Sequence, residues 1–341
     1  MRVQFLPVNG GGGCAHYRLM QQMTHFIQNP SLGVTPVYVG NWIQKVGQAI
    51  IYAQSLYGEK EFEDLLKFKV FNKEVKIIID YDDLCFSEKS DLNSSYNIFL
   101  RDVDPVENRR VLKKYLHEVA DMITVTNENL KEEFSSIYPA ERIRVIPNYL
   151  SIRDWAYHGS SAVPRDRVFF YSGSASHFDN DKKLYGDFTP ALANYLHDKN
   201  MIFQGDYSPW FCKKVAHVHW TTLSTYSRSV HENTRYAKFT LAPLTDNRFN
   251  RCKSSLKYLE SCAIGRVCLV SYFTGSPYSI ADLEQKIPER ASIKEIEEIV
   301  GKAEEKYSEI LEYQYDLLSN FWLDNNINKY KELFDEVCSI H

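Results

Sequence analysis

Short apolar runs alternate with amphipathic stretches along the first half of the chain. The run at residues 3–7 leads into four glycines and then into a helical pattern at about 15–28. A buried strand, a glycine-rich turn and a helix in this order open a Rossmann-like unit. The same pattern predicts further strands at 36–39, 49–53, 76–80 and 122–126, and helices that include 59–68 and 107–120. Strands that alternate with helices predict a mostly parallel sheet.

The alternation resumes after a polar stretch at residues 158–165. Before it, residues 142–150 have the pattern of a last strand that continues into a linker. Strands are then predicted at 168–172, 201–204, 239–244 and 267–271, with a helix or loop near 207–214. The tail from about 293 to 338 has a charged helical pattern. The sequence therefore predicts two α/β units, one after the other.

Length, composition and charge agree with two soluble domains. A chain of 341 residues exceeds one typical core, and its 44% hydrophobic and 25% charged residues are close to the averages of soluble domains. The formal net charge of −4 gives no overall attraction to nucleic acid or anionic lipid, although a local basic groove can exist within that average.

Cysteine usage and hydropathy indicate the compartment. The seven cysteines are odd in number and include no CxxC pair, which is typical of a reduced cytosolic protein. No apolar run reaches the roughly 18 residues of a membrane span, and the N-terminus lacks a signal-peptide pattern. We therefore expect a cytoplasmic protein without integral membrane association.

The stretch from residue 239 to residue 271 carries the densest set of candidate ligands. Its pattern is a strand, a polar loop, a helix and a second strand. A loop that opens a helix in an α/β sheet directs backbone N–H groups and the helix dipole at an anion, and a diphosphate would fit there. Lys257 and Glu260 are three residues apart, so one helical face offers a cation and a carboxylate for phosphate and ribose. The polar residues of this segment are Asn250, Arg251, Lys253, Ser254, Ser255, Lys257 and Glu260.

This segment resembles the nucleotide-sugar site of GT-B glycosyltransferases, in particular the retaining family four and its short bacterial and phage relatives. Those relatives carry the pattern "aPL…N..KS.lKylE..A.G.p…S". The positions that match it here are Ala242, Pro243, Leu244, Asn250, Lys253, Ser254, Leu256, Lys257, Tyr258, Leu259, Glu260, Ala263, Gly265 and Ser271. The wider family has two glutamates separated by seven residues. Cys252 stands at the position of the first glutamate, so only Glu260 is carried over as a ribose ligand.

The resemblance implies a GT-B fold, with two Rossmann-like domains that face across a cleft and a C-terminal helix that crosses back. It divides the chain into an acceptor-binding domain at 1–157, a nucleotide-sugar domain at 158–325 and the returning helix at 326–341. It implies transfer of a hexose or pentose from a nucleoside diphosphate donor, expected to be a UDP-sugar, to a hydroxyl acceptor with retention of configuration. Lys253 and Ser254 would bind the phosphates. Lys253 and the helix dipole would stabilise the leaving diphosphate, so no obligatory metal is expected.

The glycines at 10–13 form a second candidate loop. They lack the full G-x-G-x-x-G spacing, so they do not indicate a dinucleotide, and a flexible turn is the alternative. The resemblance places Gly12 and Gly13 beside the donor phosphate and the acceptor.

Three carboxylates follow the apolar strand that ends near residue 79. Asp80, Asp82 and Asp83 are therefore expected at the carboxyl end of the sheet, where α/β active sites open. Asp82 and Asp83 are the candidate catalytic residues, which could bind acceptor hydroxyls, serve as a base or hold a cation. A solvated turn is the alternative. The D-x-D metal motif belongs to another glycosyltransferase architecture, so it does not indicate Mg²⁺ here.

A third loop follows the first strand of the second unit. It resembles the "GS..H..D" loop of the relatives, in which Gly173 and Ser174 present N–H groups to the donor phosphate or sugar. His177 would bond the same group or cap the next helix. The family's arginine and lysine are missing at the expected offset, so Lys253 with Arg251 or Arg248 is expected to balance the diphosphate.

The acceptor is less constrained by the sequence than the donor. The composition and compact size are similar to those of phage proteins, which favours 5-hydroxymethylcytosine in phage DNA and the host cytoplasm as the location. The alternatives are a polysaccharide or lipid-linked glycan acceptor, and a non-catalytic nucleotide-sugar-binding module that has lost the first glutamate.

Overall fold

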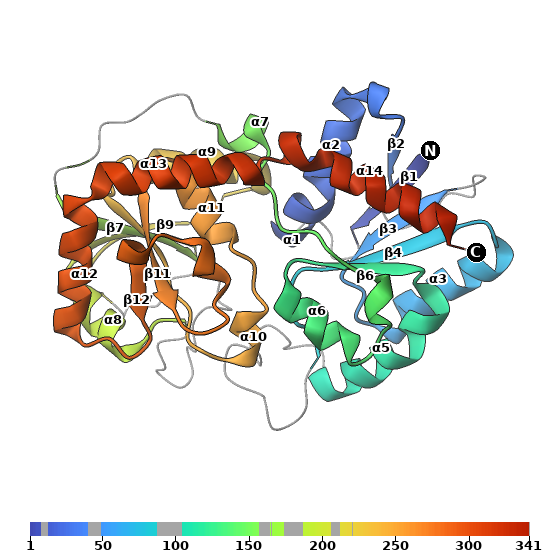
Figure 1. Ribbon diagram of the computed structural model, residues 1–341, viewed down its shortest axis with the longest axis horizontal. Coiled ribbons are helices and arrows are strands. Elements are labelled where there is room, and N and C mark those ends of the chain that lie inside the picture. Colours follow the sequence, from blue (N-terminus) through green and yellow to red (C-terminus); the bar gives the residue numbers. More distant parts are fainter. Residues whose placement is uncertain are drawn as a thin grey trace.

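The computed structural model describes residues 1–7, 13–39, 49–86, 104–156, 164, 166–173, 187–205, 212–219 and 221–340. Within these residues the chain forms two six-stranded sheets, one in each half (Figure 1). The strand orders are β2-β1-β3-β4-β5-β6 and β12-β11-β10-β7-β8-β9, and the described strand pairs are parallel. The predicted α/β class with a parallel sheet in each half is confirmed.

The first sheet contains the strands that the apolar runs predicted. They are β1 (Arg2–Pro7), β2 (Thr35–Tyr38), β3 (Ile50–Gln54), β4 (Lys76–Tyr81), β5 (Met122–Val125) and β6 (Ile143–Val145). Its helices are α1 (Gly13–Ala15), the π-helical turn η1 (His16–Met20), α2 (Gln21–Gln28), α3 (Glu59–Phe71), α5 (Pro105–Val119) and α6 (Glu128–Ser135). The central strands β3, β4 and β5 are buried except at Lys76, because helices cover both faces of a parallel sheet.

The second sheet contains four predicted strands and two that the pattern missed. The predicted ones are β7 (Val168–Gly173), β8 (Asn200–Gly205), β10 (Phe239–Ala242) and β11 (Val267–Tyr272). The missed ones are the edge strands β9 (Lys214–Val218) and β12 (Lys286–Pro288). Where a helix or loop was expected near 207–214, the chain enters β9 at residue 214. This strand is mostly exposed, so it lacks the apolar run that marks a central strand.

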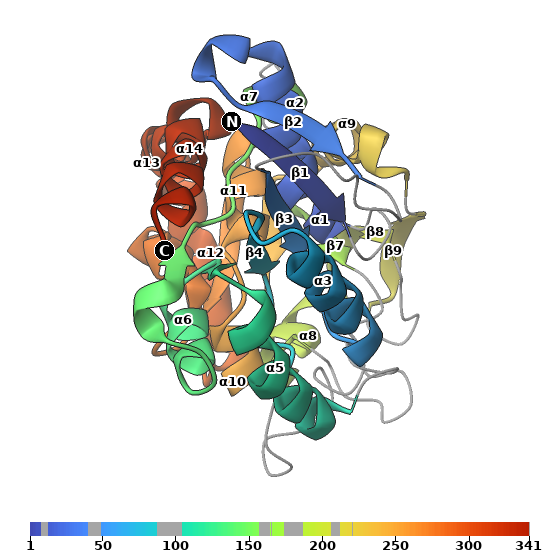
Figure 2. The ribbon, with the colours of Figure 1, turned by 90° about the vertical axis from the view of Figure 1, so that its right-hand side faces the viewer.

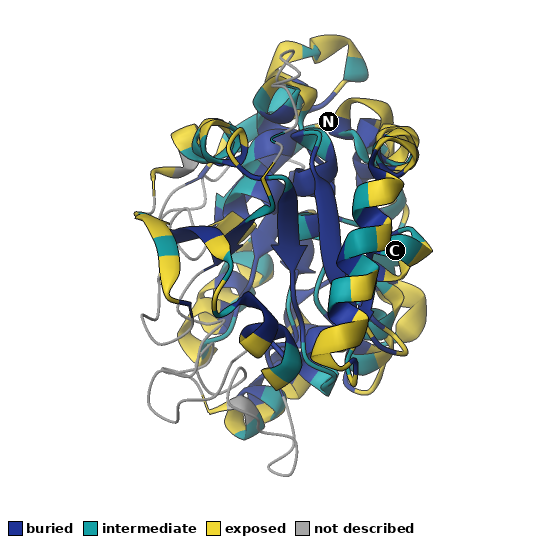
Figure 3. Cartoon of the chain, turned by 90° about the vertical axis from the view of Figure 1, so that its left-hand side faces the viewer, coloured by how far each residue is buried: buried dark blue, intermediate teal, exposed yellow. Residues whose placement is uncertain are grey.

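Helices α8 (Pro190–Leu196) and α9 (Leu223–Thr234) also belong to the second half. Figure 3 shows that helices with exposed outer faces surround the buried strands. The predicted boundary at 157/158 stays a prediction, because residues 157–163 lie outside the described residues.

The C-terminal tail forms α12 (Ile293–Glu305), α13 (Tyr307–Leu318) and α14 (Leu323–Ser339). The last of these lies on the N-terminal half (Figures 1 and 2). There Tyr330 and Phe334 pack edge-on against Tyr52 of β3, with ring centroids 6.3 and 5.8 Å apart. The expected returning helix is confirmed. Among the described residues no helix combines the length and the apolar character needed to cross a membrane.

The two connections between the halves run side by side. Leu150, in the first connection, donates a backbone hydrogen bond to Phe321 and accepts one from Leu323, at 3.0 and 2.9 Å. Because both ends of the C-terminal half are fixed to the same place, the loops after β4 and β10 are held on facing sides of the halves.

Candidate active site

The candidate site lies where loops from both halves meet. Contacts that cross between the halves here include Tyr17 to Glu260, Asn148 to Ser254 and Asp83 to Lys253, at 2.6, 2.9 and 3.8 Å. Each joins a residue near the carboxyl end of the first sheet to the segment that follows β10. The structure therefore brings the two main groups of predicted ligands together.

The polar loop after β10 is broken into two short helices. They are α10 (Arg248–Arg251) and α11 (Leu256–Ala263), so Lys253 and Ser254 lie in the turn between them. Ser255 is the N-cap of α11, and no side-chain cap bond is found there among the described residues. The first N–H groups of α11 are consequently available to an anion.

The turn is held by two asparagines at the start of α6 that the sequence analysis did not single out. The amide of Asn127 donates to the carbonyls of Cys252 and Lys253 at 2.8 and 2.9 Å. The amide of Asn129 donates to the carbonyl of Arg251 at 2.8 Å. Cys252, which stands in place of the family's first glutamate, is buried in the apolar core of the first half. Its role here is packing between the halves.

Lys253 lies beside the carboxylates of the first half. Its Nζ atom is 3.8 Å from Asp83 Oδ1 and 4.6 Å from the centre of the Phe249 ring. Burial alone lowers the pKa of Lys253, but Asp83 and Asp187 raise the pKa above its usual value. The ammonium group therefore stays charged in a partly buried place.

Asp82 and Asp83 are not in the solvated turn that was the alternative interpretation. Asp82 is 8% exposed, and its Oδ1 atom has no hydrogen-bond partner among the described residues. Burial and the charge of Asp83 raise the pKa of Asp82 to about 7. Burial also raises the pKa of Asp83, and Lys253 opposes this shift. One of these carboxyls can therefore exchange a proton near neutral pH.

Cys14 completes a small cluster with these two aspartates. Ligand atoms of Cys14, Asp82 and Asp83 all lie within 4.8 Å of one another. This spacing can hold a cation, but Lys253 already supplies a positive charge beside Asp83. Cys14 is exposed as a residue, but desolvation of its thiol and the charges of Asp82 and Asp83 raise the pKa of that thiol, which disfavours the thiolate that a metal requires.

Asp80 has a different environment from its two neighbours. Both of its oxygens accept bonds from Arg18, from Nη2 at 2.6 Å and from Nε at 2.9 Å, and both side chains are fully buried. Tyr52 donates to Asp80 as well, at 3.2 Å. Asp80 therefore belongs to the framework under the site.

Glu260 is almost fully buried at 7% exposure and is bonded to two tyrosines. The hydroxyl of Tyr17, on η1 of the first half, donates to Oε1 at 2.6 Å, and that of Tyr226, on α9, donates to Oε2 at 3.3 Å. Burial raises the pKa of Glu260, while these two hydrogen bonds and Lys257 lower it. Neither tyrosine was identified from the sequence, because neither lies in a recognisable motif.

Lys257 connects α11 to the end of β7. Its Nζ atom donates to the Ser172 carbonyl at 2.6 Å and lies 4.9 Å from the centre of the Tyr171 ring. Burial lowers the pKa of Lys257 to about 8. A Cβ atom at Gly173 would come within 2.5 Å of the Tyr171 ring, so a glycine is needed for this close approach. Lys257 and Glu260 also line one small cavity with Ser172 and Ser261.

Several predicted ligands turn away from this place or lie outside the described residues. Asn250 is buried and donates to the Thr245 carbonyl at 2.9 Å. Arg251 pairs with Asp246 at 2.7 Å on the surface, and Arg248 pairs with Glu133 of α6. Gly13 begins α1. The remaining predicted residues, Gly12, Ser174 and His177, are outside the described part of the chain.

Comparison with solved structures shows which fold this is. HepE from Anabaena, solved with UDP and glucose, aligns over 100% of this chain and 100% of its own, with a TM-score of 0.67 and 12% identity. A glycosyltransferase from Rickettsia africae aligns over 100% of this chain and 99% of its own, with a TM-score of 0.66 and 12% identity. HepE has also been solved with UDP-glucose, and that structure gives a TM-score of 0.66 over 98% of this chain. The likeness confirms the predicted GT-B fold.

No protein-family model matches the chain, and no curated protein matches it.

Proposed function

We propose that this protein is a glycosyltransferase that moves a sugar from a nucleoside diphosphate donor to a hydroxyl acceptor. The observation that carries this proposal is that a cation and a hydroxyl of the second half lie next to carboxylates of the first half. Lys253 and Ser254 offer a cation and a hydroxyl from the second half, and Lys253 Nζ lies 3.8 Å from Asp83 Oδ1 in the first half. A donor bound between the halves would have its phosphates next to Lys253 and Ser254. The carboxylates of the first half would lie next to the acceptor and could take up its proton.

The donor is proposed to be a UDP-sugar. HepE, which has the same fold, was solved with UDP and with UDP-glucose, so these compounds are the first to test. Glu260 is proposed as the ribose ligand. A carboxylate has about four lone-pair sites, and Tyr17 and Tyr226 use two of them, so two stay available to ribose hydroxyls.

The proposed reaction uses Lys253 for electrostatic catalysis. The bond between the sugar carbon and the diphosphate oxygen breaks, and its electron pair stays on the diphosphate. Lys253 and the N-terminus of α11 stabilise this growing charge, so the step does not depend on a metal ion. The acceptor oxygen bonds to the sugar carbon and its proton passes to a carboxylate. Asp82, whose pKa is about 7, suits this exchange.

Retention of configuration is proposed from the resemblance to family four, and the acceptor is proposed from the composition and compact size of the chain. For the acceptor we propose the hydroxyl of 5-hydroxymethylcytosine in DNA, with a polysaccharide or lipid-linked glycan as the second choice. A direct assay separates them. The protein and a sugar donor are mixed with hydroxymethylated and plain duplexes, and the digested nucleosides are analysed by mass spectrometry. Transfer to a glycan with no adduct on either duplex would exclude DNA and keep the transferase.

A non-catalytic sugar-binding module is the alternative from another class. Cys252 favours it, because the family's first glutamate is absent. Incubation with a panel of labelled nucleotide sugars tests the choice, since a transferase hydrolyses its donor slowly without acceptor. Lys253→Met should abolish this hydrolysis. Lys67→Met, which removes a side chain that is 67% exposed on α3, is the matched control and should retain it. Donor binding without hydrolysis in the wild type would establish the module.

A further inference from the structure

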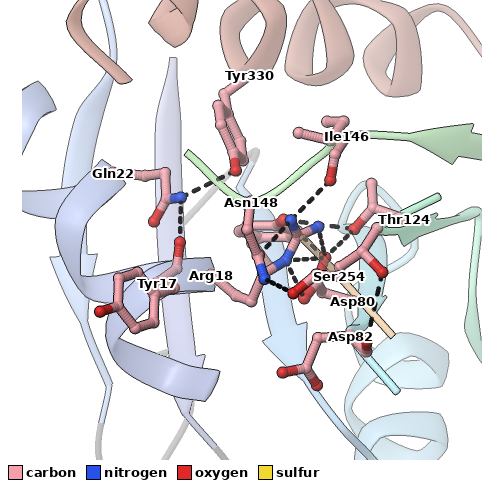
Figure 4. A network of polar contacts seen from close by, with 12 residues as sticks. Tyr17, Arg18, Gln22, Asp80, Asp82, Thr124, Ile146, Asn148, Ser254 and Tyr330 are labelled. Carbon is pink, nitrogen blue, oxygen red and sulfur yellow. Dashed lines mark hydrogen bonds and ion pairs between the residues drawn. The ribbon is translucent and has the colours of Figure 1, made fainter. Parts of the chain in front are cut away.

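A line of polar side chains links the buried core of the first half to Ser254 of the second half (Figure 4). We call it the polar relay, and it consists of Asp80, Arg18, Asn148 and Ser254. Arg18 binds Asp80 through Nε and Nη2, while its Nη1 donates to Asn148 Oδ1 at 3.1 Å and to the carbonyl of Ile146 at 2.7 Å. Asn148 Nδ2 then donates to Ser254 Oγ at 2.9 Å.

The direction of each hydrogen bond in the relay is fixed by chemistry. A guanidinium group only donates, so the atom of Asn148 that faces Arg18 must be the amide oxygen. The amide NH₂ group, which also only donates, is then the atom that faces Ser254. Ser254 Oγ must accept this bond, and its own proton is left to point elsewhere.

We propose that Asn148 is a positioning residue that makes Ser254 a hydrogen-bond donor to the diphosphate of the bound nucleotide. This inference rests on the proposed function. A serine hydroxyl can donate or accept, but only donation favours an anion. The relay uses a lone pair of Ser254 that faces Asn148, so the proton of the hydroxyl points away from Asn148 and is available to a ligand.

The relay fixes the direction of the hydrogen bond at Ser254 and adds almost no net charge beside it. The positive charge of Arg18 is already balanced by Asp80, and both side chains are fully buried. Asn148 is 5% exposed, so water does not compete freely for its amide. The hydrogen bond from Asn148 to Ser254 also joins the linker to the second half. The role of the Ser254 hydroxyl as a donor therefore depends on this arrangement of the two halves.

The substitution that tests the relay is Asn148→Asp. It keeps the size and the acceptor for Arg18 but puts an oxygen where the NH₂ group was. Ser254 must then donate to that oxygen and is lost to the diphosphate. The added negative charge also repels a diphosphate, so the same change is made in a Ser254→Ala background, where the repulsion stays and the relay is absent. The coupling between the two changes isolates the relay.

Calorimetry with UDP and with uridine on the full chain gives the readout. We expect Asn148→Asp to weaken UDP binding roughly tenfold more in the presence of Ser254 than in the Ser254→Ala background, a coupling of the size found for hydrogen bonds to charged groups. Uridine has no phosphate, so its affinity should be unchanged in all variants. Ser254→Thr, which keeps the hydroxyl, should keep UDP affinity within a few-fold.

Each other result overturns the relay. Equal weakening in the two backgrounds would assign the effect to charge alone. A Ser254→Ala variant with wild-type UDP affinity would remove the hydroxyl from the phosphate site, and this variant tests the relay even when Asn148→Asp does not fold. If the wild type binds UDP and no variant weakens it, only the relay fails. If the wild type binds neither UDP nor uridine, the proposed UDP-sugar donor fails together with the relay.

Discussion

Asp80 and Asp82 are two residues apart at the end of β4, yet they have opposite environments. Both oxygens of Asp80 are bonded to Arg18, and the pair is fully buried. Asp82 is also buried, but its Oδ1 has no hydrogen-bond partner among the described residues, and its burial together with the charge of Asp83 raises its pKa. The first carboxylate is neutralised by a cation, and the second is not.

This difference separates a structural role from a chemical one. A buried carboxylate with a bidentate arginine is held in one geometry and in one protonation state. A buried carboxylate next to another one tends to take up a proton or to accept a hydrogen bond from a hydroxyl group. Its unpaired charge destabilises the fold while no ligand is bound. Stability is commonly lost in this way where a site must react. Substitution of Asp80 should therefore cost much more stability than substitution of Asp82.

The largest effect is expected when the paired carboxylate is removed. Asp80→Ala leaves Arg18 buried without its counter-charge, which should lower the free energy of unfolding by about 3–5 kcal/mol. Urea unfolding followed by circular dichroism measures it through the midpoint. Asp82→Ala is the matched control and should cost far less. Equal losses for both variants would show that the two carboxylates do not differ in the way described.

Removal of the cation beside Asp83 should affect turnover more than stability. Lys253→Met should lower kcat with a UDP-sugar by about 10²–10³-fold, the usual effect of losing one group that stabilises developing charge. The melting temperature should stay close to that of the wild type, because the Lys253 and Asp83 side chains are 17% and 15% exposed and Asp83, whose pKa is raised, can take up a proton when the cation is lost. A variant in which only KM changes would mean that Lys253 binds the donor equally well before and during the reaction.

Glu260 is the carboxylate of the second half, and it is bonded to hydroxyls instead of a cation. Glu260→Gln removes its charge with little change in size and should weaken UDP binding by about 1.5–3 kcal/mol. Calorimetry with UDP measures this loss, and Glu63→Gln on the exposed face of α3 is the control. The loss of affinity caused by Glu260→Gln should be smaller for 2′-deoxy-UDP than for UDP. The deoxy compound lacks one of the two ribose hydroxyls that Glu260 is proposed to bind. Unchanged affinity for UDP would leave Glu260 a purely structural acceptor for Tyr17 and Tyr226.

The smallest effect is expected for Asp82 itself, and it depends on pH. Its pKa is about 7 in the folded protein and 3.8 in an unperturbed carboxyl, so between these values the folded state binds more protons than the unfolded state. Stability contributed by this group is therefore present below about pH 4 and is lost as the pH rises through about 7.

Asp82→Asn should remove this loss of stability at high pH, because asparagine has no carboxyl group to ionise. We expect the variant to be more stable than the wild type at pH 8 by about 1–2 kcal/mol, with a smaller difference at pH 5. It should also have lower transferase activity. Urea titrations at the two pH values measure the difference, and a variant that is less stable than the wild type at pH 8 would show that Asp82 is held by a favourable partner.

The sequence by itself determined the parts of this protein that depend on local pattern. The apolar runs predicted the strands of the first sheet and the four central strands of the second, because a buried strand needs a continuous apolar segment in the sequence itself. The helical tail was predicted for the same reason. Lys253 and Ser254 were predicted as ligands because they follow a strand in a loop that opens a helix, and Glu260 because it shares a helical face with Lys257 and matches the ribose ligand of the resembled family.

The tertiary structure alone decided which charges and hydroxyls meet. Arg18 and Asp80 are 62 positions apart, Asn148 and Ser254 are 106 apart, and Tyr17 and Glu260 are 243 apart. It also placed Arg248 beside Glu133, 115 positions away, and left Asp82 Oδ1 without a hydrogen-bond partner among the described residues. Periodicity describes a chain over a few turns or one strand, whereas hydrogen bonds and ion pairs act over a few ångströms in space. The function of a carboxylate in this protein is therefore set by which distant segment the fold brings next to it.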